Sequence, residues 1–202
     1  MRIWREGYNM LLNRVIQAIK NRYIEFKDNI RWGSKGKGTH IIKPMRLIGK
    51  TRIFIGDNVT ILNNARLETL REWKGTILNG ILKIGDNTSI EQSCHIVSAK
   101  EIEIGHDSVF SAYVYVSDCA HGYDIGDSIM DSQLDIKPVK IGNHCFVGIG
   151  SCIMPGVSLG DNVVVGANSV VTKSFSDNCM IAGSPAKMIK KYDEATRIWV
   201  KC

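Results

Sequence analysis

The chain lacks long hydrophobic runs. No stretch approaches the ~18 consecutive apolar residues of a transmembrane helix, and the N-terminal residues show no apolar core followed by a small-residue cleavage site. The six cysteines form no Cys-x-x-Cys pair and have no zinc-ligand spacing with histidine. These absences predict a cytoplasmic protein with reduced thiols. With 44% hydrophobic and 23% charged residues, the 202-residue composition is that of a globular domain and excludes disorder and collagen.

An excess of one charge sign is confined to the N-terminal segment. Residues 1–37 hold nine basic and three acidic residues, which accounts for the whole net charge of +6, and the other 165 residues hold 17 of each sign. A domain that follows nucleic-acid phosphates would spread its basic residues more widely, so nucleic acid is not expected as a partner. Apolar residues recur at helical spacing between these basic ones, which predicts a basic helix over residues 2–27.

A six-residue period runs through the rest of the chain. We call the large apolar residue that opens each hexad its anchor, and glycine often follows it, as in Ile84-Gly85 and Ile141-Gly142. The residue four places after the anchor is small or β-branched, as in Thr88 and Cys145. A period of six matches neither an α-helix nor a long alternating strand. It indicates a solenoid of short strands and tight turns, in which stacked coils bury both positions as ladders.

Three hexads make one coil of 18 residues, and the spacing of the coils locates insertions. The expected stacks bring together Ile84, Ile104, Ile141 and Leu159; Ile90, Phe110, Val147 and Val165; and Ile96, Val116, Ile153 and Val171. Extra residues must then loop out within 68–83 and 117–140. We therefore expect a basic helical segment at 1–40, an all-β solenoid at 41–185 and a short C-terminal helix at 186–202. Insertions of a solenoid usually carry its specific contacts.

The hexads resemble those of the hexapeptide-repeat acyltransferases, and of the sugar O-acetyltransferases among them. The resemblance depends on VSDCAHGYDI at 116–125, the hexads of 141–171, Val-Thr-Lys at 171–173 and AGSPAK at 182–187. It implies a left-handed parallel β-helix and a homotrimer with active sites between neighbouring copies. It also implies transfer of acetyl from acetyl-CoA, with no metal, to a sugar hydroxyl of a surface polysaccharide such as O-antigen, capsule or exopolysaccharide.

The resemblance also assigns the acetyl-transfer site. His121, at the root of the second insertion, matches the histidine that acts as general base on the poorly nucleophilic acceptor hydroxyl. Asp118 either orients that imidazole or caps a turn. Cys119 stands where some relatives have a second histidine, and nothing nearby in the sequence activates its thiol. The remaining histidines, including His106 and His144 at corners of the coil, are expected to be background.

Two further sets of residues complete the expected site. The acceptor side is expected to involve Glu91, Tyr123 and Asp124. The positions that match contacts to acetyl-CoA are Gly148, Ile149, Gly166, Ala167, Thr172, Lys173, Lys187 and Lys190. Glycines at two of these positions allow close backbone approach, and the lysines meet phosphates.

Several alternatives remain open at this point. The acceptor could be a small non-saccharide molecule such as serine or an antibiotic, or the coil could be a non-catalytic scaffold. A carbonic-anhydrase-like β-helix would need paired histidine ligands, and positions 116 and 126 are valine and glycine. The basic helix at 2–27 has two possible roles. It could pack over the end of the coil or within the trimer, or it could contact the inner face of a membrane peripherally.

Overall fold

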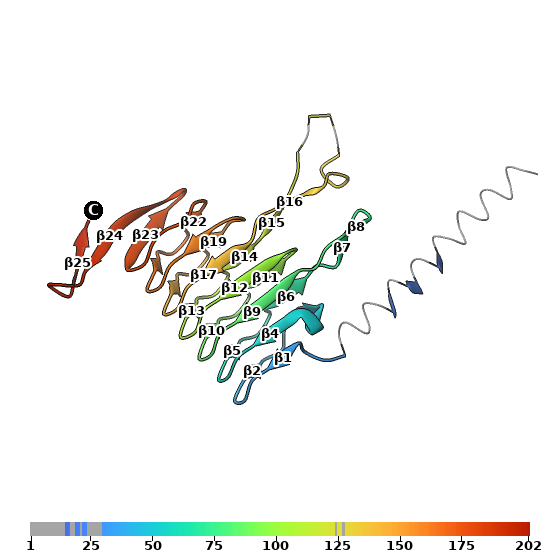
Figure 1. Ribbon diagram of the computed structural model, residues 1–202, viewed down its shortest axis with the longest axis horizontal. Helices are drawn as coiled ribbons and strands as arrows, with labels where there is room; N and C mark the ends of the chain where they lie inside the picture. The colour runs from blue at the N-terminus through green and yellow to red at the C-terminus, as the bar shows by residue number, and fades with distance from the viewer. Residues whose placement is uncertain (1–14, 17–18, 21, 24–29, 124, 127) are drawn as a thin grey trace, which may run out of the picture.

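The computed structural model describes residues 15–16, 19–20, 22–23, 30–123, 125–126 and 128–202. The expected N-terminal helix over 2–27 therefore lies mostly outside the described residues. The described chain winds into a parallel β-helix of stacked coils (Figure 1). No helix among the described residues is long and apolar enough to cross a membrane.

Three parallel sheets form the sides of the coil. The first sheet contains β1 (Ser34–Lys35), β4 (Ile53–Ile55), β9 (Ile81–Ile84), β12 (Glu101–Ile104), β17 (Val139–Ile141) and β20 (Ser158–Leu159). The second contains β2 (His40–Ile41), β5 (Thr60–Ile61), β10 (Ser89–Ile90), β13 (Val109–Phe110), β18 (Phe146–Val147) and β21 (Val164–Val165), and it continues into the C-terminal strands. The third contains β3 (Arg46–Ile48), β6 (Arg66–Thr69), β11 (His95–Ser98), β14 (Tyr115–Ser117), β19 (Cys152–Ile153) and β22 (Val170–Val171). A 3₁₀ turn, η1 (Lys50–Arg52), precedes β4.

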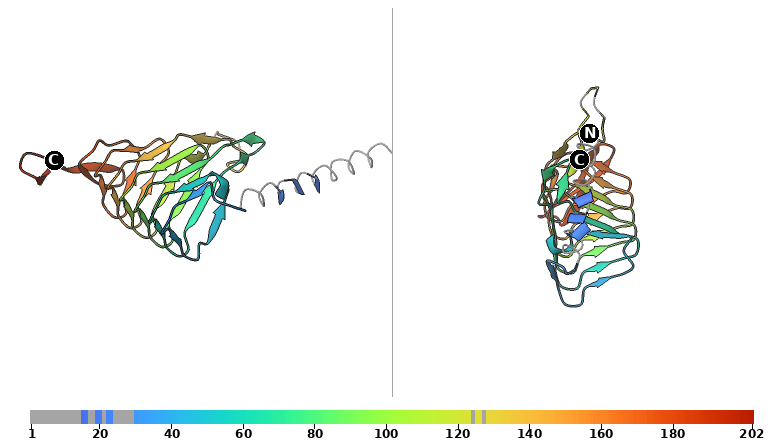
Figure 2. Two further views of the ribbon diagram at one scale, coloured as in Figure 1. Left: turned by 60° about the horizontal axis from the view of Figure 1, so that its bottom comes forward. Right: turned by 90° about the vertical axis from the view of Figure 1, so that its right-hand side faces the viewer.

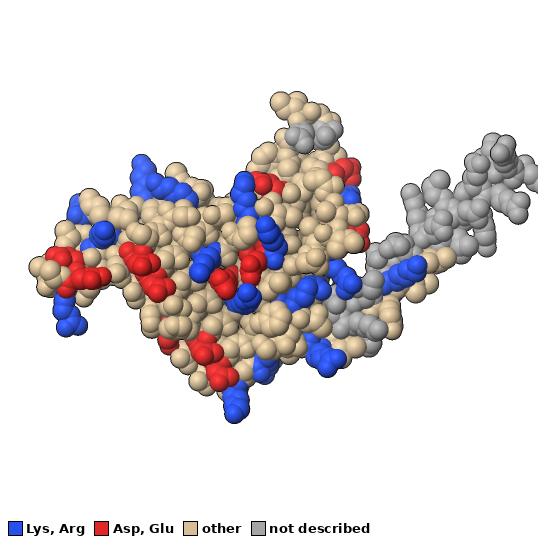
Figure 3. All heavy atoms as spheres, in the orientation of Figure 1, with Lys and Arg blue, Asp and Glu red and all other residues tan. Residues whose placement is uncertain are grey.

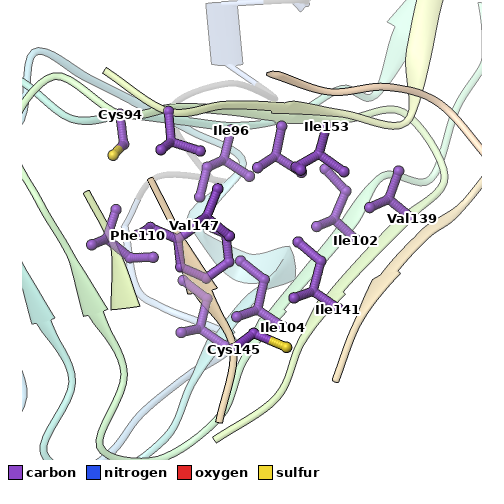
Figure 4. Packing of buried hydrophobic residues seen from close by; sticks show 14 of the residues in the cluster. Cys94, Ile96, Ile102, Ile104, Phe110, Val139, Ile141, Cys145, Val147 and Ile153 are labelled. Atoms are coloured by element: carbon purple, nitrogen blue, oxygen red, sulfur yellow. The ribbon is translucent and has the colours of Figure 1, made fainter. Parts of the chain in front are cut away.

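The register of these strands confirms the predicted stacks. Ile104 pairs with Ile84 and Ile141, and the same in-register pairing joins the members of the other two stacks. The anchors point inward from all three sheets and fill the middle of the coil (Figure 4). Each fully buried aliphatic side chain contributes about 1.5–3 kcal/mol relative to an exposed one. The period of six is thus the spacing at which one side of the coil follows the next.

Two antiparallel hairpins leave the coil within the two predicted insertions. The first consists of β7 (Glu72–Trp73) and β8 (Thr76–Ile77), and the second of β15 (Cys119–His121) and β16 (Leu134–Ile136). Both project from the same side of the coil (Figures 1 and 2). The coil itself begins earlier than the expected boundary at residue 41, because Ser34 and Lys35 already pair with β4.

The predicted C-terminal helix is wrong. Residues 186–201 form two strands, β24 (Ala186–Asp193) and β25 (Ile198–Lys201), which follow β23 (Cys179–Gly183) as an antiparallel extension at the end of the coil (Figure 1). The free edge of β23 offers unpaired backbone groups, and pairing with β24 satisfies them. Ala186 and Met188 alternate with exposed Lys187 and pack toward the core, which is a period of two.

Charged side chains of both signs are interspersed over the face of the coil seen in Figure 3. This distribution agrees with the equal numbers of acidic and basic residues beyond position 37. The coil therefore presents no extended single-sign surface on that face.

Candidate active site

The second hairpin begins where β14 leaves the third sheet, and its root is closed by Asp118. The carboxylate is fully buried and accepts four hydrogen bonds, from the Ser98 hydroxyl and from the backbone N–H groups of Ala99, Lys100 and Glu101, at 2.6–2.9 Å. A carboxylate has about four acceptor positions, so this one is saturated. Asp118 therefore holds the neighbouring coil's turn at 98–101. His121 is not among its described partners, so the structure gives the expected orienting role no hydrogen bond.

Cys119 follows in β15 and has no sign of activation. Burial raises the pKa of its thiol, and the hydrogen bond with Ser117 only partly opposes this effect. A thiol with a raised pKa stays protonated near neutral pH and is a poor nucleophile. The structure supports the view that Cys119 takes no part in the chemistry.

His121 is the exposed end of β15 and contacts the first hairpin. Its backbone pairs with Leu134 of β16, and its ring lies edge-to-face against the indole of Trp73, with ring centroids 5.0 Å apart. Among the described residues, the imidazole has no hydrogen-bond partner. Its orientation therefore depends on the hairpin backbone and on Trp73.

The two hairpins are joined to each other at the residues beside this contact. Trp73 Nε1 donates to the backbone oxygen of Ser132 at 2.8 Å, and Thr76 Oγ1 donates to Gln133 Oε1 at 3.1 Å. Lys74 forms an ion pair of 2.7 Å with Asp131. Sequence reasoning missed Trp73, although it located both insertions. The only signal was that a large aromatic residue stands in the shorter insertion.

The expected acceptor residues are placed differently from one another. Tyr123 is 78% exposed, two residues beyond His121, and Asp124 lies outside the described residues. Glu91 lies on a different corner, between the second and third sheets, where it accepts a hydrogen bond of 3.0 Å from Ser89. Of the expected acceptor residues that the structure describes, Tyr123 is near His121 and Glu91 is not.

The expected acetyl-CoA residues follow the corner between the second and third sheets and then the C-terminal extension. Ile149 is 48% exposed at this corner. Ala167 stacks on the preceding residue, Gly148, so closely that a Cβ on Gly148 would lie 2.6 Å from the Ala167 nitrogen. Gly166 is similarly restricted by Ala182. The remaining members are placed beyond this corner: Thr172 and Lys173 directly after β22, and exposed Lys187 and Lys190 on β24.

His121 lies at the corner between the third and first sheets, one corner further along the coil than Ile149. Four of the expected acetyl-CoA residues (Gly148, Ile149, Gly166 and Ala167) therefore lie on a different corner from His121, whereas Thr172 and Lys173 follow β22 at the same corner as His121, further along the coil. A groove of about 640 Å³ on the outer face of the first sheet, lined in part by Phe54, Lys83, Glu103 and Lys140, contains none of the expected site residues.

The fold and this site define a parallel β-helix with hexapeptide coils and a histidine displayed on an inserted hairpin. Residues 138–173 match the family model described as the hexapeptide repeat of succinyl-transferase. Two of the similar proteins are from Escherichia coli (strain K12). One is the putative lipopolysaccharide biosynthesis O-acetyl transferase WbbJ, 36% identical over 60% of this chain and 66% of WbbJ. The other is the putative colanic acid biosynthesis acetyltransferase WcaF, 30% identical over 73% of this chain and 72% of WcaF.

Among solved structures, AntD, an N-acyltransferase from Bacillus cereus in complex with dTDP and 3-hydroxybutyryl-CoA, has the same fold. Its TM-score is 0.68 at 23% identity, and the match covers 83% of this chain and 87% of AntD. The chain spans about two thirds of the length of the curated relatives that it matches. It belongs to the hexapeptide-repeat acyltransferases, in the sugar O-acetyltransferase group.

Proposed function

We propose that this protein is an acetyl-CoA-dependent O-acetyltransferase that acts on a sugar hydroxyl in the biosynthesis of a surface polysaccharide. The similarity to WbbJ and WcaF supports the reaction class and the acceptor class. The observation that carries the proposal is the position of His121, exposed on an inserted hairpin and fixed against Trp73. A scaffold with no reaction would have no need for an ordered imidazole at this place.

In the proposed reaction, an imidazole nitrogen of His121 accepts the proton of the sugar hydroxyl as its oxygen bonds to the thioester carbonyl carbon. The tetrahedral intermediate carries the charge on the former carbonyl oxygen, which needs backbone N–H donors. When the intermediate collapses, the carbon–sulfur bond breaks and the thiolate takes the proton from His121. The products are the acetyl ester and free coenzyme A, and the histidine returns to its starting state.

We place acetyl-CoA along the corner of Gly148, Ile149, Gly166 and Ala167, with Thr172, Lys173, Lys187 and Lys190 toward its phosphates. This corner and His121 belong to different edges of one chain, so a neighbouring copy has to bring the two together. That requirement supports a homotrimer of left-handed coils with sites between copies. Backbone N–H groups such as that of Ile149 would then be available to the thioester region.

The acceptor is proposed to lie between the two hairpins, near Trp73 and Tyr123, with Asp124 on the same loop and Glu91 supplied from a neighbouring corner. Loop residues of this kind decide which hydroxyl reaches the base.

We also propose that the reaction takes place on the cytoplasmic side. Residues 2–27 are proposed to pack on the assembly, and the alternative is contact with an anionic membrane. Flotation with anionic liposomes distinguishes the two, when the full chain is compared with a truncation after residue 30.

The test is release of free coenzyme A from acetyl-CoA in the presence of a panel of nucleotide sugars and oligosaccharides, with mass detection of the acetylated sugar. His121→Ala should lower kcat by roughly 10²–10⁴-fold. His40→Ala, at an exposed histidine of the first coil, is the matched control and should keep the wild-type rate. A His121→Ala variant with near-normal turnover would remove His121 as the base, and wild-type protein inactive on all acceptors would oppose the proposed reaction.

A further inference from the structure

Two side-chain ladders run along the corner between the first and second sheets. In the first ladder, the residue two places after each anchor uses a side-chain oxygen to accept the backbone N–H of the coil before it. The bonds are Lys37 to Asp57, Asp57 to Asp86, His106 to Asn143, Asn143 to Asp161 and Asp161 to Asp177, at 2.7–3.1 Å. In this described series the step from Asp86 to His106 is missing, because an imidazole at that position offers no oxygen.

The second ladder is formed by the next residue of each coil, and from Asn58 to Asn178 these residues adopt left-handed backbone angles. Asparagine amides hydrogen-bond from coil to coil, in the steps Asn58 to Asn87, Asn87 to Asp107, Asn162 to Asn178 and Asn178 to Glu194, at 2.9–3.2 Å. His144 stands at this position with a φ of 54°, and no ladder bond joins it to Asp107 or Asn162 among the described contacts. Asparagine adopts this conformation more readily than most residues.

The two ladders are therefore interrupted in neighbouring coils, and each time by a histidine. The two imidazoles face each other edge-to-face, with ring centroids 5.0 Å apart. Asp107 lies between them, with its Oδ2 at 2.6 Å from His106 Nδ1 and 4.0 Å from His144 Nδ1. Local departures from an otherwise regular pattern are expected at functional sites, where binding or catalysis compensates for the stability lost with the ladder hydrogen bonds.

We propose that His106, Asp107 and His144 bind a divalent transition-metal ion of the zinc type. One ligand atom from each residue lies within 4.8 Å of the others, so rotation of the exposed rings can bring them to a common ion at about 2.0–2.2 Å. Two imidazoles and one carboxylate suit Zn²⁺, Ni²⁺ or Cu²⁺, whereas Mg²⁺ and Ca²⁺ prefer oxygen ligands.

The surroundings of the cluster favour this occupant. The Asn87 amide holds Asp107 Oδ1, which leaves Oδ2 directed toward the histidines. The three side chains are 38–53% exposed, so an ion can enter from solvent, and three protein ligands leave a position for water. The cluster lies on a different corner from His121 and from Ile149. It is thus independent of acetyl transfer, which needs no metal.

The test is titration of EDTA-dialysed full-length protein with ZnCl₂ by isothermal calorimetry. A Cys202→Ser background removes the exposed thiol as a competing ligand. We expect one Zn²⁺ per chain in the parent and binding roughly 100-fold weaker in His144→Asn. His40→Ala should bind as the parent does, and MgCl₂ should give no binding heat.

His144→Asn also controls for folding, because asparagine restores the residue type of the second ladder. Without metal, this variant should unfold at the same temperature as the parent or at a higher one. Three results would overturn the proposal: a parent protein that gives no Zn²⁺ binding, a His144→Asn variant that binds as tightly as the parent, or an equal loss of binding in His40→Ala.

Discussion

The imidazole of His121 and the indole of Trp73 pack edge-to-face at 5.0 Å, although the two residues come from different insertions of the coil. The indole is itself fixed, because its Nε1 donates to the backbone oxygen of Ser132 in the hairpin that carries His121. Each hairpin therefore orients the other. The Asp118 carboxylate binds the backbone of the turn at 98–101. Among the described residues, Trp73 is therefore the side chain that contacts the imidazole of the proposed base and can position it.

Replacement of Trp73 should lower turnover without removing the base. We expect Trp73→Ala to reduce kcat roughly 10–100-fold, because an unrestrained imidazole spends less time aligned with the acceptor hydroxyl. Trp73→Phe should recover most of the rate, and the KM for acetyl-CoA should stay unchanged in both variants. Initial rates at varied acetyl-CoA concentration give both constants.

Lys74→Ala is the matched control for this prediction. It removes the exposed ion pair with Asp131 but leaves the contact between Trp73 and His121, so kcat should stay close to wild type. If Lys74→Ala and Trp73→Ala lower kcat equally, the effect belongs to hairpin docking in general and not to the position of the imidazole.

The Asp118 carboxylate should be needed for stability. Asp118→Asn keeps the size of the side chain but replaces one acceptor oxygen by a donor that faces backbone N–H groups. We expect a loss of roughly 3–5 kcal/mol in the free energy of unfolding, since hydrogen bonds to a buried charge are lost and donors are left unpaired. Urea unfolding followed by circular dichroism measures this loss.

Asp135→Asn serves as the comparison, because Asp135 lies on the same hairpin in an exposed ion pair with Lys137. Its removal should change stability by less than about 1 kcal/mol. An Asp118→Asn protein that unfolds at the wild-type urea concentration but has lost most of its kcat would instead give Asp118 the role of orienting His121.

Cys119 should be dispensable for the reaction. Burial raises the pKa of its thiol, so the thiolate is scarce at neutral pH. Cys119→Ser should leave kcat within about threefold of wild type, since serine has nearly the same shape. Iodoacetamide followed by mass mapping should label exposed Cys202 before Cys119. Loss of activity in Cys119→Ser, together with rapid labelling of Cys119, would contradict this expectation.

The coil was predictable because its pattern is local. The stack of Ile90, Phe110, Val147 and Val165 follows from counting hexads, and each coil depends on the one before it in the chain. The C-terminal strands were not predictable in the same way. Their apolar spacing fits a helix or a strand, and the free edge of β23, a feature of the folded coil, decides between them.

The candidate site, like the fold, was predictable from the sequence only in part. The second insertion and His121 could be located from spacing and resemblance, because both are properties of the chain at one place. The contact between Trp73 and His121 could not be predicted from the sequence. Trp73 and Ser132, whose hydrogen bond fixes the indole, are 59 residues apart and meet only in the folded hairpins. The single histidines at 106 and 144 likewise looked unremarkable until the corner ladders brought them face to face.

The buried thiols should make the protein sensitive to alkaline pH. Burial raises the pKa of Cys145 from 9.0 to about 11, because the thiolate is poorly solvated inside the coil. The unfolded chain therefore loses this proton at lower pH than the folded protein does. The contribution to stability is complete below pH 9 and is lost as the pH rises toward 11, by about 2 kcal/mol at pH 10.5.

Cys145→Ser isolates this effect. Serine occupies the same inward position in other hexads, such as Ser151 in the next hexad of the same coil. The Ser151 hydroxyl donates to a carbonyl of the next coil much as the Cys145 thiol does, so the substitution suits the fold. Urea unfolding under reducing conditions at pH 8 and at pH 10.5 should show a loss of stability smaller by about 2 kcal/mol in Cys145→Ser than in wild type. Cys202→Ser, at an exposed thiol, should lose as much as wild type. Equal losses in all three proteins would mean that the Cys145 thiol ionises as readily in the folded coil as in the unfolded chain.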